Sequence, residues 1–178
     1  MTSIQVLAPG WHVPDGEPEV QVGEVWTARI EVKPARPASS EAWQPDVVDA
    51  YDGSDPMLRP IAGVAAGYEF TATATVTGRR WTVLAIDSLR MAVPSLHDDA
   101  VSGRGVFVHD THFIDEPEII SALEIPLLAE RIRWAAPRSP LLAVDETVEL
   151  RELDSTYDQV VEGRSTDGTF MITGHLVG

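Results

Sequence analysis

The segment from Phe70 to Thr77 constrains the fold more than any other part of the sequence, because its side chains alternate strictly between apolar residues and threonine. Residues two apart lie on the same face of a β-strand. Threonine suits the exposed face of a strand because it is β-branched yet polar. The segment is therefore predicted to be a strand with one buried and one solvent-facing side.

Other segments show related strand patterns. Between Val22 and Val32 five apolar side chains share one parity: Val22, Trp26, Ala28, Ile30 and Val32. Trp81 to Ile86 is almost continuously apolar after a Gly-Arg-Arg turn. The Asp167-Gly168 pair suits a tight hairpin turn before the last strand. Further short strands are predicted at Gly105 to Thr111, Glu130 to Ala135, Glu146 to Leu153 and Thr169 to Val177.

Helical patterning is confined to one place. Asp115-Glu116-Pro117-Glu118 has the composition of a helix start, and a helix running to Leu123 would be ended by Pro126. We therefore predict an all-β protein, mainly antiparallel, either barrel-like or sandwich-like, with at most one or two short helices.

A length of 178 residues suits a single β-rich unit over residues 1–178. An alternative is a subdivision into two related small β halves, residues 1–95 and 105–178, because the strand openings near Val22 and Val144 resemble each other. Residues 34–60 hold five prolines and no lasting periodicity, so we expect a long irregular loop there.

Charge and composition limit the partners. Thirteen basic and 28 acidic residues give a net charge of −15, which repels nucleic acid and anionic lipid. Cysteine is absent, which excludes disulfides, thiolate metal ligands and cysteine nucleophiles. No apolar run is long enough to span a membrane, and the first residues lack the features of a secretion signal. We therefore expect a cytoplasmic protein with neither a nucleic-acid nor a membrane partner.

A histidine- and aspartate-rich segment is the candidate for metal chemistry. Imidazole and carboxylate groups together bind divalent transition metals, and the negative field of the chain would favour a cation. However, residues three apart on a regular strand face opposite sides, so the strand would have to end or bulge for both central histidines to bind one ion. The candidate ligands are His97, His109, Asp110, His112 and Asp115.

Aromatic and acidic residues in the irregular segments are candidates for recognition of a partner. Trp11 and Trp43 lie in proline-rich sequence beside acidic residues, and Asp52 and Asp55 lie in the long loop. Aromatic side chains dominate the energetics of many protein interfaces, although loop tryptophans also fold back onto cores.

Two functions follow from these features. The first is a non-enzymatic binding or accessory module, without a cofactor, that presents residues 34–60 and 95–116 to a protein partner. A basic partner would suit the charge, as for an inhibitor or an immunity protein. The alternative is a metal-dependent hydrolase that uses the histidine and aspartate cluster near residues 97–116 to activate water. The sequence identifies neither the partner or substrate nor the oligomeric state.

Overall fold

Strands dominate the chain, as the alternating patterns predict. The computed structural model describes residues 3–35, 57–61, 64, 66–94, 100–110, 112–135, 150–158 and 168–178. Within these ranges the strands are β1 (Ser3–Pro9), β2 (Val25–Ala28), β3 (Ile30–Pro34), β4 (Leu58–Pro60), β5 (Gly67–Thr77), β6 (Trp81–Ile86), β7 (Leu89–Pro94), β8 (Ala100–His109), β9 (Ile125–Ala135), β10 (Leu150–Leu153) and β11 (Thr169–Leu176). The helices described are a short 3₁₀ helix, η1 (Gly10–His12), and one α-helix, α2 (Pro117–Ala122).

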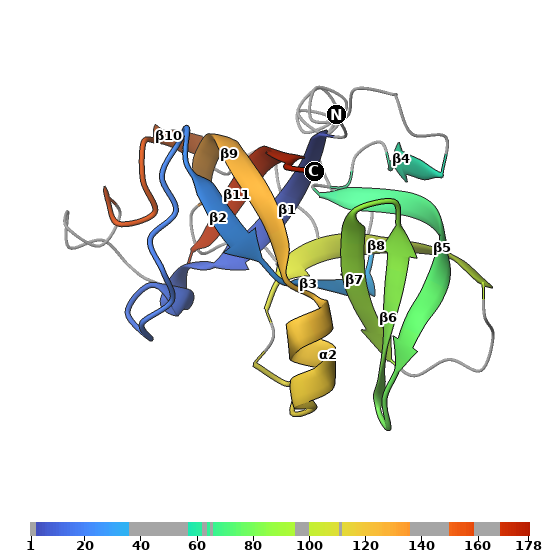
Figure 1. The fold of residues 1–178 in the computed structure, drawn as a ribbon. Coiled ribbons are helices and arrows are strands. Elements are labelled where there is room, and N and C mark those ends of the chain that lie inside the picture. Colours follow the sequence, from blue (N-terminus) through green and yellow to red (C-terminus); the bar gives the residue numbers. More distant parts are fainter. Residues whose placement is uncertain are drawn as a thin grey trace.

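The prediction of an all-β, mainly antiparallel and barrel-like fold is confirmed. Five strands pair in a closed ring in the order β8, β3, β7, β6, β5 and back to β8. Only the β3–β7 pair in this ring is parallel, with Glu31 opposite Ala92. Figure 1 shows the ring on the right of the molecule, with α2 below its junction with the remaining strands.

A second group of strands extends from the ring. β1 pairs with β8 in parallel, with Leu7 opposite Val108, and then with β11, which pairs with β9. The far edge of β9 is shared by β2 and β10 (Figure 1). Strands that precede residue 95 therefore pair with strands that follow residue 105, as β1 does with β11 and β2 with β9. The subdivision into two related halves, residues 1–95 and 105–178, stays a prediction.

The predicted strand at residues 22–32 is two strands. The predicted parity holds for Trp26, Ala28 and Ile30, which are all buried, whereas Val22 is 40% exposed. The break falls at Arg29, because β2 pairs with β9 while β3 pairs with β8. A change of partner requires the chain to leave one ladder before it joins the next.

Two further predictions were wrong in detail. Pro126 does not directly follow the helix: α2 ends at Ala122 and Pro126 lies inside β9, opposite Thr27 of β2. In the predicted strand from Glu130 to Ala135, alternation with the apolar Ile132 and Trp134 predicts that Arg133 faces solvent. Arg133 is only 2% exposed, because its face of the sheet is also covered and it lies opposite the buried Met171.

The ends of the predicted irregular loop at residues 34–60 belong to strands, because β3 includes Pro34 and β4 covers Leu58–Pro60. Residues 36–56 lie outside the described part of the chain. Among the residues that are described, no helix is long and apolar enough to cross a bilayer.

Candidate functional site

The end of β8 carries the first residues of the predicted histidine and aspartate cluster. His109 is the last residue of the strand and lies opposite Ile30 of β3. Its side chain is buried, and its ring packs edge-on against Trp26 with the ring centroids 4.9 Å apart. The backbone N–H of Arg29 donates to His109 Nδ1 over 3.0 Å, which fixes the ring at the junction of β2 and β3.

Asp110, the residue after His109, contacts Lys33 and the backbone of His112. Only 3% of this residue is exposed, and its Oδ2 lies 3.0 Å from Nζ of Lys33. The other carboxylate oxygen, Oδ1, accepts a hydrogen bond of 3.1 Å from the backbone N–H of His112. A carboxylate that bonds the amide two residues later forms an Asx turn, so Asp110 turns the chain at the end of the strand. Lys33 also lies 3.9 Å from Glu31.

Burial affects the pKa of this small charge cluster. Removal of Glu31 from water raises its pKa, the positive charge of Lys33 opposes the shift, and the negative charge of Asp110 adds to it. Lys33, the only lysine of the chain, thus lies between two carboxylates. The cluster holds the end of β8 against β3.

Beyond the Asx turn three rings meet, which we call the aromatic surface: Trp11, His112 and Phe113. The centroids of Trp11 and His112 are 5.7 Å apart, those of His112 and Phe113 are 5.6 Å apart, and both pairs are edge-to-face. Phe113 is 68% exposed, the highest value among the large apolar side chains of the described residues. Trp11, a predicted partner-binding residue, is half-buried in η1.

The chain that follows Phe113 is anchored again within three residues. Ile114 is 3% exposed and packs in the apolar cluster of α2. Asp115 pairs with the side chain of Arg80, whose hydrogen bond and charge hold the pKa of that carboxyl below its usual range. Glu116 accepts hydrogen bonds from the backbone N–H groups of Arg79 and Arg80. Phe113 is therefore displayed between two anchors, Asp110 before it and Ile114 to Glu116 after it.

The predicted metal ligands are thus divided among separate environments. His109 contacts Trp26, His112 contacts Trp11, and Asp110 and Asp115 each pair with a basic side chain. In the ranges that the structure describes, no three His, Asp or Glu side chains are grouped so that they could hold a metal ion. His97 lies outside those ranges, so the metal site stays a prediction.

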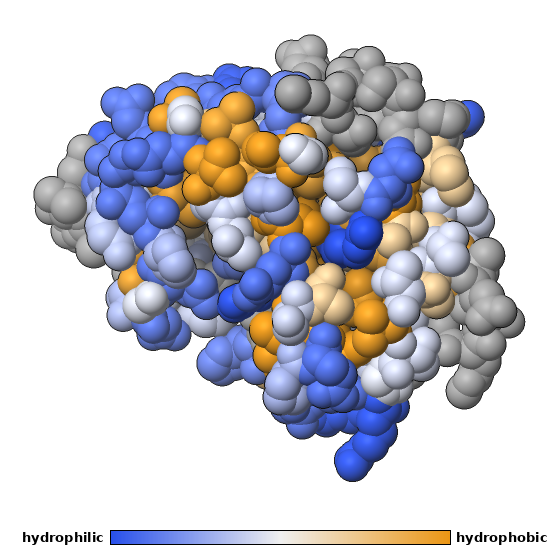
Figure 2. Space-filling model, in the orientation of Figure 1, coloured by the Kyte–Doolittle hydropathy of each residue, from blue (hydrophilic) through white to orange (hydrophobic). Residues whose placement is uncertain are grey.

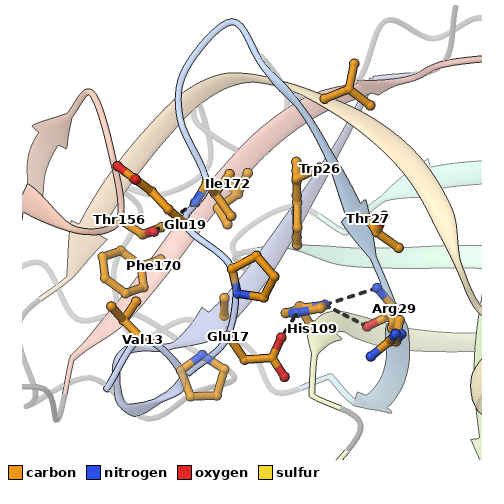
Figure 3. A pocket seen from close by; sticks show the side chains of 15 residues that line it. Val13, Glu17, Glu19, Trp26, Thr27, Arg29, His109, Thr156, Phe170 and Ile172 are labelled. Atoms are coloured by element: carbon orange, nitrogen blue, oxygen red, sulfur yellow. Dashed lines mark hydrogen bonds and ion pairs between the residues drawn. The ribbon is translucent and has the colours of Figure 1, made fainter. Parts of the chain in front are cut away.

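A cavity of about 330 Å³ has His109 in its lining. It is enclosed by β1, β2, β11 and the segment that follows η1, as Figure 3 shows for the labelled side chains. Its lining is mostly apolar and includes Val13, Val20, Val25, Trp26, Phe170 and Ile172.

Val25 lies at the outer side of β2 and is 56% exposed, opposite the half-buried Leu128 of β9. In Figure 2 apolar residues gather over β2 and β9, with hydrophilic residues around them. Apolar surface therefore continues from the cavity lining to the outside of the molecule.

One wall of the cavity carries ionisable groups. Glu17 points toward His109, with 3.9 Å between Glu17 Oε2 and His109 Nε2 (Figure 3). The guanidinium of Arg29 also lines the cavity and is held by Glu124 at 2.6 Å. A carboxylate and an imidazole therefore stand together beside apolar walls.

Glu19 contributes a second carboxylate at the opposite wall. It accepts hydrogen bonds from the hydroxyl of Ser155 and from the side-chain amide of Gln21, and these bonds lower its pKa. Thr156, next to Ser155, accepts a hydrogen bond from the backbone N–H of Val20 and also lines the cavity. These bonds attach the segment after η1 to the end of β10.

Not every residue proposed from the sequence can be placed. Trp43, Asp52 and Asp55 lie outside the described residues. Sequence reasoning did not select Phe113 or Glu17. An aromatic residue inside a polar, histidine-rich segment was the signal for Phe113, whereas no local signal brings Glu17 together with His109.

Comparison of the chain with known protein families, curated proteins and solved structures finds no match. The aromatic surface and the cavity are therefore interpreted from the positions and chemistry of their own residues.

Proposed function

We propose that this chain is a non-enzymatic binding module whose aromatic surface docks onto a basic protein partner. The observation that carries the proposal is the display of Phe113, which is 68% exposed although the chain on both sides of it is anchored. A preordered apolar side chain loses little conformational entropy when it becomes buried in an interface. Large aromatic side chains are typical anchors of protein interfaces.

Charge supports a basic partner. The chain has a net charge of −15, and the segment beside Trp11 contains Asp15, Glu17 and Glu19. Asp15 is exposed, and the two glutamates are partly exposed. An arginine or lysine of a partner could lie over a ring of the aromatic surface while its charge faces these carboxylates. Cytoplasm remains the expected location of this module.

The test compares surface variants of the purified protein as affinity baits. Phe113→Ser removes the displayed ring, and Val177→Ser removes a 38% exposed side chain elsewhere. Each exposed substitution should change stability by no more than about 0.5 kcal/mol. If Phe113 is an interface anchor, its loss should weaken binding by about 2 kcal/mol or more, roughly 30-fold, at physiological salt.

The expected result is a basic protein retained by the wild-type and Val177→Ser baits and released by Phe113→Ser. Retention by all three baits would contradict the proposed surface. Basic proteins that bind without preference and dissociate at modest salt would contradict specific recognition, because screening weakens the attraction between exposed charges.

A further inference from the structure

The cavity beside His109 has the size and lining of a small-molecule site. Its volume of about 330 Å³ lies within the range of ligand pockets, roughly 300–1,000 Å³. The indole of Trp26 and the ring of Phe170 supply two aromatic walls, and Val13 and Ile172 supply aliphatic ones. Such walls favour a compact apolar body over a sugar or a phosphate ester.

The ionisable groups in the lining indicate the charge of the ligand. Glu17 and Glu19 contribute two carboxylates, and His109 contributes an imidazole that lies 3.9 Å from Glu17. The single guanidinium, that of Arg29, is paired with Glu124. Glu19 is held by the hydroxyl of Ser155, and Glu17 points toward His109 (Figure 3). Glu17 is thus the carboxylate that lies beside the buried His109.

Aromatic and carboxylate groups together suit a cation. An ammonium group is attracted by the face of an indole ring and by a carboxylate, and removal from water strengthens both attractions. Trp26 supplies such an indole ring to the cavity lining.

We infer that the cavity binds a small organic cation, in which an ammonium group is joined to a compact aromatic or aliphatic body. The ammonium group faces Glu17, and the apolar body lies between Trp26, Phe170 and Val13. The cavity shares Glu17 and Glu19 with the acidic segment beside the aromatic surface, but none of Trp11, His112 and Phe113 lines it, so ligand binding can be tested without the proposed protein partner.

The experiment titrates the ¹⁵N-labelled full chain with three probes of similar shape: 2-phenylethylamine, 2-phenylethanol and phenylacetate. Indole N–H signals report the binding, with Trp26 in the cavity and Trp81 on β6 as an internal reference. The expected result is a saturable shift of the Trp26 signal by the amine, with a dissociation constant at least tenfold below that of the alcohol. The anion should bind most weakly.

Three variants test whether the shift of the Trp26 signal and the preference for the amine arise from binding in the cavity beside Glu17. Val13→Phe fills the cavity and should abolish the shift caused by the amine, whereas Glu17→Gln should make the amine and the alcohol bind equally. Glu118→Gln, on α2, removes one negative charge just as Glu17→Gln does and should keep the preference for the amine. An unchanged Trp81 signal shows that each variant is folded, and Glu17→Gln tests the inference even if Val13→Phe does not fold.

The inference would be overturned if the amine left Trp26 unmoved in the wild-type chain, or if the alcohol bound as well as the amine. It would also be overturned if Glu17→Gln kept the preference for the amine. Loss of protein binding in Phe113→Ser would affect only the proposed function, because Phe113 does not line the cavity.

Discussion

Replacement of Tyr68 by phenylalanine should weaken the junction between the closed ring and the second group of strands. β5 and β1 pair with successive parts of β8, and Tyr68 lies where one gives way to the other. Its hydroxyl accepts a buried hydrogen bond of 2.8 Å from the backbone N–H of Gln5, while its ring stacks on Phe107 at 4.5 Å. Phenylalanine keeps the stacking and removes only the hydroxyl.

The expected cost follows from the donor that is left behind. Gln5 is fully buried, so its N–H would lose its acceptor without gaining water, which costs about 1–3 kcal/mol. For a chain of this length that loss lowers Tm by roughly 2–12 °C. Urea unfolding should show a lower midpoint with an unchanged slope. Tyr157→Phe, at a 38% exposed position, is the matched control, and equal stability of the two variants would refute the reasoning.

Three further variants test the anchors around the site, each by urea unfolding. Asp110→Ala should cost about 1.5–3 kcal/mol, because it removes a charged hydrogen bond to Lys33; a loss below that of an exposed substitution would contradict the role of Asp110 as an anchor. The free energy of unfolding of Glu31→Gln should increase relative to that of the wild type as pH rises. The pKa of Glu31 is raised in the folded state, so the folded protein binds the carboxyl proton more tightly than the unfolded chain does. Ionisation of Glu31 therefore destabilises the wild type at pH values above the folded pKa. The difference should disappear below the unfolded pKa near 4.5, and a gain only at acidic pH would show the opposite sign. Ile119→Ala should cost about 2–5 kcal/mol because this side chain is fully buried, and the half-buried Ile120→Ala should cost less; the reverse order would show that α2 packs through another face.

The sequence predicted strands that show an alternating pattern or an apolar run after a turn. β5 and β6 were found, β5 from its threonine alternation and β6 from its apolar run after a turn. β1 was missed because all seven of its residues are buried, so no solvent-facing side chains mark one of its faces. A strand without a wet face has no period of two to detect.

The candidate site was predictable only in part. The histidine and aspartate segment was recognised as unusual, and its composition suggested ligands for a metal. In the structure Asp110 turns the chain and the segment is anchored again at Glu116, while the metal site stays a prediction. The cavity could not be predicted, because it brings Glu17 and Trp26 together with Phe170 from the other end of the chain. Such contacts depend on strand order, which local patterns do not encode.

Photo-crosslinking from position 113 tests the central claim most directly. A benzophenone amino acid in place of Phe113 puts the reactive group at a 68% exposed position of the aromatic surface, and the same amino acid in place of Val177 is the control. At physiological salt the account predicts a discrete adduct with a basic protein from position 113, none from position 177, and a weaker adduct when Asp110→Ala removes the turn. Equal adducts from both positions, or an adduct unaffected by Asp110→Ala, would contradict recognition through the displayed ring.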